Sequence, residues 1–179
     1  MQIAILSDSH DHIPNLCRAV SRANRENAEI MIHCGDLISP FMLKRLHDFQ
    51  GQVHLIYGNN AGDQHLISTR CATKFANISH HGLQGEIKAG DKRICFIHYP
   101  HTGRALARTG EYDIVCCGHN HKQGIETIGN CLLINPGDLL GAEVEPGFML
   151  LDTETMQVQR IIVGTLMNFD DFDQQTSTL

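Results

Sequence analysis

The sequence predicts an α/β protein, a two-sheet β-sandwich flanked by helices in four layers, folded as a single domain. Continuous apolar runs such as residues 2–6, QIAIL, are typical of strands that are covered on both faces. Early in the chain these runs alternate with helical patterns, and later they follow one another through short turns. The chain has 179 residues, 42% of them hydrophobic, which is enough for one domain with a sizeable core. We expect the domain to span residues 1–165, followed by an acidic, flexible tail at 166–179.

The first half of the chain predicts a β-α-β-α-β unit. Its strands are expected at residues 2–6, 29–36 and 52–59. Apolar residues at helical spacing predict a helix from about Ile13, with Pro14 in its first turn, and Pro40 begins a second helix. A weaker helical pattern covers residues 64–74. This order implies parallel strands that are joined by right-handed crossovers.

The second half predicts mainly strands and short connections. Residues 85–100 indicate a hairpin that turns at Gly90 and Asp91, and residues 102–110 indicate a short helix. Further strands are expected at residues 112–121, 131–138, 147–152 and 157–163. The two halves together predict two packed sheets with helices outside.

Charge and composition indicate which binding partners and which cellular compartment to expect. The formal net charge is −6, and no basic stripe is visible. This argues against a nucleic acid as a binding partner, although it does not exclude one as a substrate. No leader and no membrane span are expected, because Met1 runs directly into a strand and no apolar run reaches about 18 residues. Seven cysteines without metal-type spacing predict buried, reduced thiols and a cytoplasmic protein.

Metal-type side chains follow the strand ends. They are Asp8, His10, Asp36, Asn59, His98, His119 and His121. The carboxyl ends of the strands share one edge of an open α/β sheet, where ligands bind. Asp8 and His10 are two residues apart, as are His119 and His121, and in an extended chain this spacing puts both members of a pair on one side. Glycines precede Asp36, Asn59 and His119, which allows the backbone to turn sharply there.

The donor set indicates the chemistry. Carboxylates, imidazoles and an amide oxygen together suit Mn²⁺, Fe²⁺ or Zn²⁺. Seven ligands are too many for one ion with an open position, whereas two ions that share one carboxylate would use them well. Two metals about 3.5–4 Å apart clamp the attacking and leaving oxygens of a phosphoryl displacement, and a hydroxide that bridges them is the natural nucleophile.

In this order, the motifs DSH, GD, GN, H and GHNH over residues 8–121, followed by NPGD, resemble the calcineurin-like metallophosphoesterases. Within them, the short chain is similar to the small YfcE/Vps29-like phosphodiesterase branch, over residues 1 to 165. The resemblance implies that Asp36 bridges two metals and that all seven positions hold competent ligands. It assigns one metal to Asp8, His10, Asp36 and His121, and the other to Asp36, Asn59, His98 and His119.

The same resemblance implies a phosphodiesterase. Its cofactors would be two divalent ions, Mn²⁺ first, with Zn²⁺, Fe²⁺ and Ni²⁺ as alternatives. The substrate would be a small phosphodiester, and the enzyme could be a homo-oligomer. Two other functions stay open: a phosphomonoesterase that uses the same metals, and a Vps29-like protein-interaction module with residual metal binding.

Two positions depart from the pattern. Larger relatives commonly have histidine as general acid where this chain has Asn60, so another residue would protonate the leaving group. His12 and His101 are the candidates, because each lies close in sequence to a ligand, and a solvent-facing loop position is the alternative for both. Asp138 stands where relatives commonly have serine. It is either a partner for a ligand histidine or a turn residue, and we favour the turn.

Overall fold

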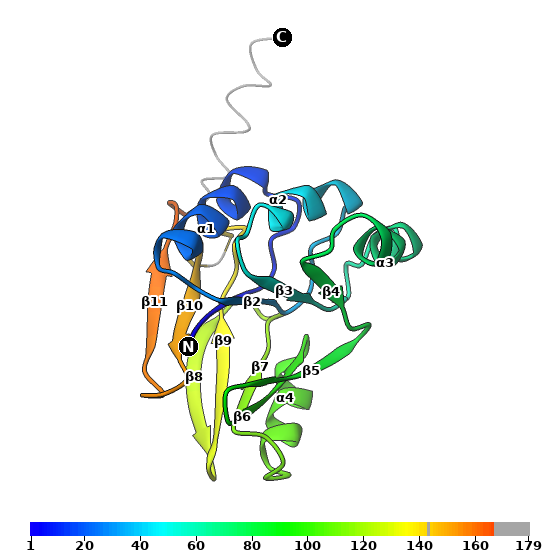
Figure 1. Ribbon diagram of the computed structural model, residues 1–179. Helices are drawn as coiled ribbons and strands as arrows, with labels where there is room; N and C mark the ends of the chain where they lie inside the picture. Colours follow the sequence, from blue (N-terminus) through cyan, green and yellow to red (C-terminus); the bar gives the residue numbers. More distant parts are fainter. Residues whose placement is uncertain (143, 167–179) are drawn as a thin grey trace.

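The computed structural model describes residues 1–142 and 144–166. Two mixed β-sheets pack face to face, and helices cover both outer faces, giving four layers in a single domain (Figure 1). The predicted fold class is therefore confirmed. Of the tail predicted at 166–179, all but the first residue lies outside the described part of the chain.

The first sheet has six strands in the order β11-β10-β1-β2-β3-β4. Their bounds are β1 (Gln2–Leu6), β2 (Ile30–His33), β3 (Gln52–Leu55), β4 (Ile78–His80), β10 (Gly147–Asp152) and β11 (Val158–Ile162). Strands β1 to β4 run parallel, and the β-α-β-α-β pattern predicts this for the first three of them. On its other side β1 pairs antiparallel with β10, with Gln2 opposite Asp152. Strand β1, near the start of the chain, and strand β10, much later in the sequence, thus lie side by side inside this sheet.

The second sheet has five strands in the order β5-β6-β7-β9-β8. Their bounds are β5 (Gln84–Ala89), β6 (Lys92–Ile97), β7 (Ile114–Cys116), β8 (Gln123–Ile128) and β9 (Cys131–Pro136). The hairpin β5–β6 turns at Gly90 and Asp91, as predicted. Strands β6, β7 and β9 are parallel neighbours.

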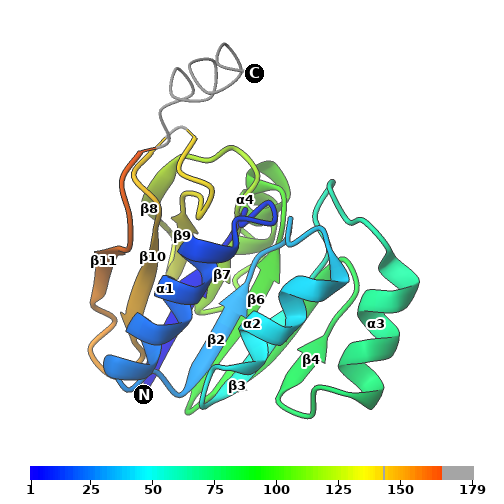
Figure 2. The same ribbon diagram turned by 90° about the horizontal axis from the view of Figure 1, so that it is seen from above.

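Three α-helices cover the first sheet and one covers the second (Figures 1 and 2). They are α1 (Ile13–Arg25), α2 (Leu43–His47), α3 (Gln64–Thr73) and α4 (Pro100–Ala107). His12 caps the N-terminus of helix α1: its Nδ1 accepts a hydrogen bond from the backbone N–H of Asn15 at 3.2 Å. No helix in the described ranges is long and apolar enough to cross a membrane.

Each gap between layers holds its own apolar core. Strand β1 shows how, because alternate side chains of a strand point to opposite faces. Ala4 and Leu6 pack into the core beneath helices α1 to α3. Ile3 and Ile5 pack into the core between the two sheets. A smaller third core lies between the second sheet and α4. This burial on both faces explains why β1 reads as an unbroken apolar run.

Several elements differ from the expectation. The second helix begins as a 3-10 turn, Pro40–Met42, and its α-helical part is only Leu43–His47. The fourth helix starts at Pro100, two residues earlier than predicted. Strand β8 was not predicted, because five of its six residues are exposed and the apolar signal of a buried strand is missing. It lies at a sheet edge and pairs only with β9.

A histidine pair joins β3 to the segment after β4. His54 Nδ1 lies 2.9 Å from His81 Nε2, and both rings pack near Phe96 of the opposite sheet. Burial, reinforced by the neighbouring His81, lowers the pKa of His54 to about 4. Burial also lowers the pKa of His81. The fold therefore holds this pair neutral.

We expect this pair to make the protein sensitive to acid. In the unfolded chain His54 takes up a proton near its ordinary pKa of about 6.5, whereas the folded chain resists protonation until about 4. Stability is therefore present above pH 6.5 and is lost as the pH falls through this window. Because His54 is partly exposed, we expect its contribution to be about 1 kcal/mol by pH 5. Urea unfolding of the wild type and His54→Gln at pH 7.5 and pH 5 measures it. An equal pH dependence in both proteins would contradict the assignment.

Candidate metal centre

The loops after five strands meet at one edge of the sandwich. Backbone hydrogen bonds hold these loops together: Asp8 N–H donates to the carbonyl of Gly35 at 3.1 Å, and Gly118 N–H donates to the carbonyl of His98 at 2.9 Å. His119 N–H donates to Asp8 Oδ2 at 2.9 Å and so links the two sheets. The edge where the strand ends meet is the place at which the sequence predicts the ligands.

Most of the predicted ligands sit on left-handed backbone. The residues with positive φ among them are Asp8 (53°), His10 (40°), Asp36 (56°), His119 (73°) and His121 (58°). The expectation that the two-apart pairs lie on extended chain is therefore wrong. The backbone turns at each ligand instead, and such conformations cost of order 1–3 kcal/mol each and concentrate at functional sites.

Asp8, His10 and His121 form a first group. His10 Nε2 and His121 Nε2 lie 3.7 and 3.6 Å from Asp8 Oδ1. His10 Nε2 also lies 3.5 Å from Asp36 Oδ2, which brings Asp36 to the edge of this group. An ion about 2.1 Å from each ligand atom would separate neighbouring ligands by roughly 3–3.5 Å. The observed spacing is close to that separation.

Asp36, Asn59, His98 and His119 form a second group. Asp36 Oδ1 lies 3.6 Å from His98 Nε2. Asn59 Oδ1 lies 2.9 Å from His98 Nε2 and 2.8 Å from His119 Nδ1. His98 Nδ1 faces the backbone carbonyl of Cys34 at 2.8 Å, so in the neutral ring this nitrogen carries the proton. The Nε2 lone pair then faces two oxygens, and a cation among these acceptors would satisfy all of them.

Buried atoms without partners support a metal. Asp8 Oδ1 and His10 Nε2 are buried and have no hydrogen-bond partner among the described residues. Asp8, Asp36 and His98 each offer a ligand atom within 4.8 Å of the others, and both carboxylates are at most 1% exposed. Two buried carboxylates this close are costly unless cations compensate them. The residues present therefore fit divalent ions of the kind that accept carboxylate, imidazole and amide ligands.

The surroundings keep Asp8 ionised. Burial alone would raise the pKa of Asp8, but the nearby His10 imidazole, the Ser7 hydroxyl and the N–H of His119 together hold that pKa below its usual value. A carboxylate that is already charged at neutral pH is ready to bind a cation.

Asp138 is a partner of His121, one of the predicted ligands. Its Oδ2 lies 2.8 Å from His121 Nδ1, and its Oδ1 accepts a hydrogen bond from the N–H of Gly141 at 2.6 Å. The side chain is fully buried. The hydrogen bond to Asp138 raises the pKa of His121 and leaves its Nε2 directed at Asp8. The preference for a turn role alone was therefore wrong: Asp138 both closes a turn and orients His121.

Two loops pass so close to Asp8 and Asp36 that only glycine fits at the point of contact. A Cβ on Gly118 would lie 1.8 Å from Ser7 Oγ and 2.6 Å from Asp8 Oδ2. A Cβ on Gly58 would lie 2.0 Å from Asp36 Oδ1. The glycines of the GN and GHNH motifs thus allow the chain to approach the carboxylates closely, whereas Gly35 of the GD motif makes room for His98 Nδ1, 2.7 Å from a Cβ at that position.

The two candidate proton donors lie outside both ligand groups. His12 caps α1 through Nδ1, as described above. His101 is exposed on α4, and its ring lies 5.7 Å from that of Tyr99. Tyr99 in turn packs edge-on against His98 and His119, at 5.3 and 4.7 Å between ring centroids. Sequence reasoning missed Tyr99, although its position directly after a ligand was a signal.

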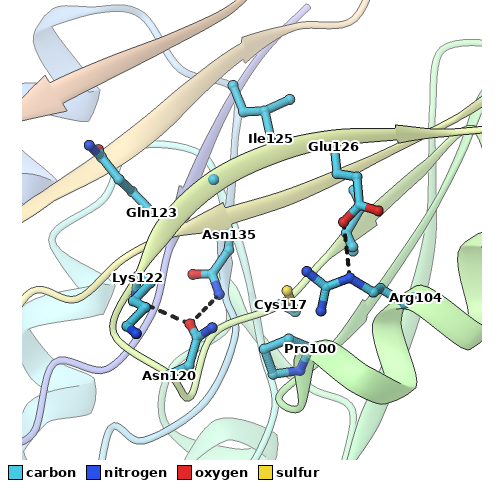
Figure 3. A pocket seen from close by; sticks show the side chains of 11 residues that line it. Pro100, Arg104, Cys117, Asn120, Lys122, Gln123, Ile125, Glu126 and Asn135 are labelled. Carbon is cyan, nitrogen blue, oxygen red and sulfur yellow. Dashed lines mark hydrogen bonds and ion pairs between the residues drawn. The ribbon is translucent and has the colours of Figure 1, made fainter.

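A pocket of about 470 Å³ adjoins the loop that carries His119 and His121. Asn120, between these two histidines, points into it and accepts a hydrogen bond from Asn135 (Figure 3). The ion pair of Arg104 and Glu126, at 2.9 Å, forms the opposite wall. The pocket therefore offers polar and charged groups one residue away from the ligands.

The sequence is similar to that of a known protein family. The profile of the calcineurin-like phosphoesterase superfamily domain matches residues 1–156. The phosphodiesterase MJ0936 of Methanocaldococcus jannaschii is 32% identical over 171 residues, which cover 91% of this chain and 99% of that protein. The probable metallophosphoesterase YsnB of Bacillus subtilis is 29% identical over 143 residues, covering 78% and 75%.

Solved structures give the same result. The structure of an archaeal phosphodiesterase matches with a TM-score of 0.84 at 30% identity, covering 90% of this chain and 99% of that one. Vps29 of Entamoeba histolytica in complex with Zn²⁺ matches with a TM-score of 0.63 at 18% identity, covering 92% and 100%. The phosphoesterase YfcE of E. coli gives 0.65 at 15% identity, covering 92% and 100%. The last two likenesses show a shared fold alone.

Proposed function

Because the chain belongs to the calcineurin-like phosphoesterase superfamily, we propose that it is a metal-dependent phosphodiesterase with two divalent ions in the centre described above. Its family makes it a phosphoric ester hydrolase, and we add the pair of ions and the diester substrate. One observation carries this: ligand-type side chains from both sheets converge around two buried carboxylates, Asp8 and Asp36, that lie within 4.8 Å of each other.

Asp36 is the residue suited to hold both ions. One of its oxygens faces His10 of the first group and the other faces His98 of the second. We assign one ion to Asp8, His10, Asp36 and His121, and the other to Asp36, Asn59, His98 and His119. When bound, divalent ions held by these residues would lower the pKa of a water molecule and stabilise negative charge on a phosphoryl group. We expect Mn²⁺ first, with Zn²⁺, Fe²⁺ and Ni²⁺ as alternatives.

The protein orients its ligands before any ion binds. The Cys34 carbonyl fixes the ring of His98, and Asp138 fixes the ring of His121. Such outer partners set the tautomer and the direction of a ligand histidine. For the proton that the leaving group needs, we keep His12 and His101 as candidates.

The named activity of MJ0936 supports a diester as substrate. A diester carries two organic groups on one phosphorus, and we place one of them in the pocket of Figure 3, between Asn120 and Arg104. All seven cysteines are free and six are buried, which supports a reducing compartment such as the cytoplasm.

The deciding experiment is metal removal and restoration. We expect protein stripped with a chelator to lose hydrolysis of an aryl phosphodiester and to regain it on addition of Mn²⁺. The matching aryl phosphomonoester is measured beside it at the same metal concentration. Turnover of the diester above that of the monoester would support the proposal.

Two other outcomes would point elsewhere. Faster turnover of the monoester would make the protein a phosphomonoesterase on the same site. Bound metal without turnover of either ester would contradict the catalytic proposal and favour the interaction module.

A further inference from the structure

The residue after the ligand Asn59 holds the bridging carboxylate. The backbone N–H of Asn60 donates to Asp36 Oδ1 at 2.8 Å, and its side-chain amide donates to Asp36 Oδ2 at 2.7 Å. We propose that Asn60 is a positioning residue: it holds both oxygens of Asp36 in the orientation that two metal ions require. This inference rests on the proposed function, because it assumes that Asp36 serves both ions.

Other residues around Asp36 support its contact with Asn60. Gly58 lets the chain pass beside Asp36, since a Cβ there would lie 2.8 Å from the Asp36 carboxyl carbon. On the other side, the backbone carbonyl of Asp36 accepts a hydrogen bond from His10 N–H at 3.0 Å. Asp36 has left-handed backbone, with φ of 56°. Both the main chain and the side chain of Asp36 are thus fixed from outside its own strand.

The two hydrogen bonds leave the metal-facing lone pairs free. Each carboxylate oxygen has two lone pairs. Asn60 uses one on each oxygen, and the imidazoles of His98 and His10 stand 3.6 and 3.5 Å from Oδ1 and Oδ2. The carboxylate plane is therefore set by Asn60 while each oxygen still faces one ligand group. This is the geometry that a shared ligand needs.

An amide suits this position better than a charged donor. It supplies N–H groups to the carboxylate without adding positive charge, so it does not compete electrostatically with the cations. It also has no proton to give near neutral pH. The position at which larger relatives commonly carry a histidine is used here to hold a ligand, and protonation of the leaving group falls to a different residue.

Asn60→Leu tests the inference, because it removes the side-chain donor, keeps similar volume and retains the backbone N–H. We expect Mn²⁺ binding, measured by titration calorimetry, to weaken about 10–100-fold, as for other partners of metal ligands. We also expect the electron paramagnetic resonance signal of a coupled Mn²⁺ pair, present in the wild type, to be replaced by that of isolated ions. Asn60→Ala serves as a second variant should leucine prevent folding.

Asn130→Leu is the matched control, since Asn130 is an exposed residue between β8 and β9. It should bind two Mn²⁺ ions as the wild type does. Unchanged affinity and coupling in both Asn60 variants would overturn the positioning role and leave the proposed function standing. A wild type that binds fewer than two ions would overturn the proposed function, and this inference with it.

Discussion

Asp36→Asn is expected to lower kcat/KM for an aryl phosphodiester by at least about a thousand-fold. The asparagine keeps the shape of the side chain but loses the charge that two ions would share. Metal-based stabilisation of a phosphoryl transition state is worth several kcal/mol, and about 4 kcal/mol corresponds to a thousand-fold in rate. Excess Mn²⁺ should not restore activity, because the shared ligand itself is changed.

The same variant should not unfold. Asp8 and Asp36 offer oxygens within 4.8 Å of each other, so removing one charge relieves their repulsion in the metal-free protein. This relief offsets the loss of a hydrogen bond with Asn60, worth about 1 kcal/mol. Thermal melts in chelator should therefore agree with the wild type, whereas added Mn²⁺ should raise Tm only in the wild type.

Asp91→Asn provides the control, because Asp91 is an exposed aspartate at the β5–β6 turn whose one ion pair among residues 1–142 and 144–166 is with Lys92. It should retain full activity and the full shift of Tm with metal. Substantial activity in Asp36→Asn would contradict the assignment of Asp36 as the shared ligand.

Asp138→Asn is expected to weaken metal binding about 10–100-fold. The asparagine oxygen can keep the hydrogen bond to Gly141, but its NH₂ group then faces His121 Nδ1, where the wild type has a carboxylate at 2.8 Å. The imidazole is thereby driven toward the tautomer whose Nε2 carries the proton and cannot bind a metal. Activity should fall at low Mn²⁺ and recover in large part at high Mn²⁺. This recovery separates an orienting residue from the shared ligand Asp36.

A turn aspartate elsewhere gives the matched control. Asp152 accepts hydrogen bonds from the backbone N–H groups of Glu154 and Thr155 and from the side chain of Gln2, and within the described part of the chain it hydrogen-bonds to no histidine. Asp152→Asn should leave the Mn²⁺ titration unchanged. If Asp138→Asn shows the same titration as this control, Asp138 has a turn role alone.

Much of the fold follows from sequence patterns, because β1 and β2 are buried on both faces over nearly their whole length and read as apolar runs. Strand β8 escapes prediction because hydrogen bonds with β9, rather than burial of its side chains, define it. The 3-10 turn at Pro40 escapes because the spacing of Leu43 and Leu46 fits both kinds of helix.

For the site, the gathering of Asp8 and Asp36 follows from the parallel strands β1 and β2, whose ends share an edge. The left-handed backbone at Asp8 and Asp36 could not be predicted, because only the assembled loops hold non-glycine residues there. The pairing of Asp138 with His121 depends on how two loops 17 residues apart fold back on each other. Local spacing carries no information about that contact.

The pairing of β1 with β10 has a consequence for how the protein is made. Synthesis delivers β1 and Asp36 early, but the strand that completes the flank of β1 ends only at Asp152. At about 5–20 residues per second, the ribosome adds the intervening residues over a time on the order of ten seconds. During that interval the nascent chain carries a half-covered apolar strand and an unfinished set of ligands. We therefore expect any metal to bind after the chain is complete.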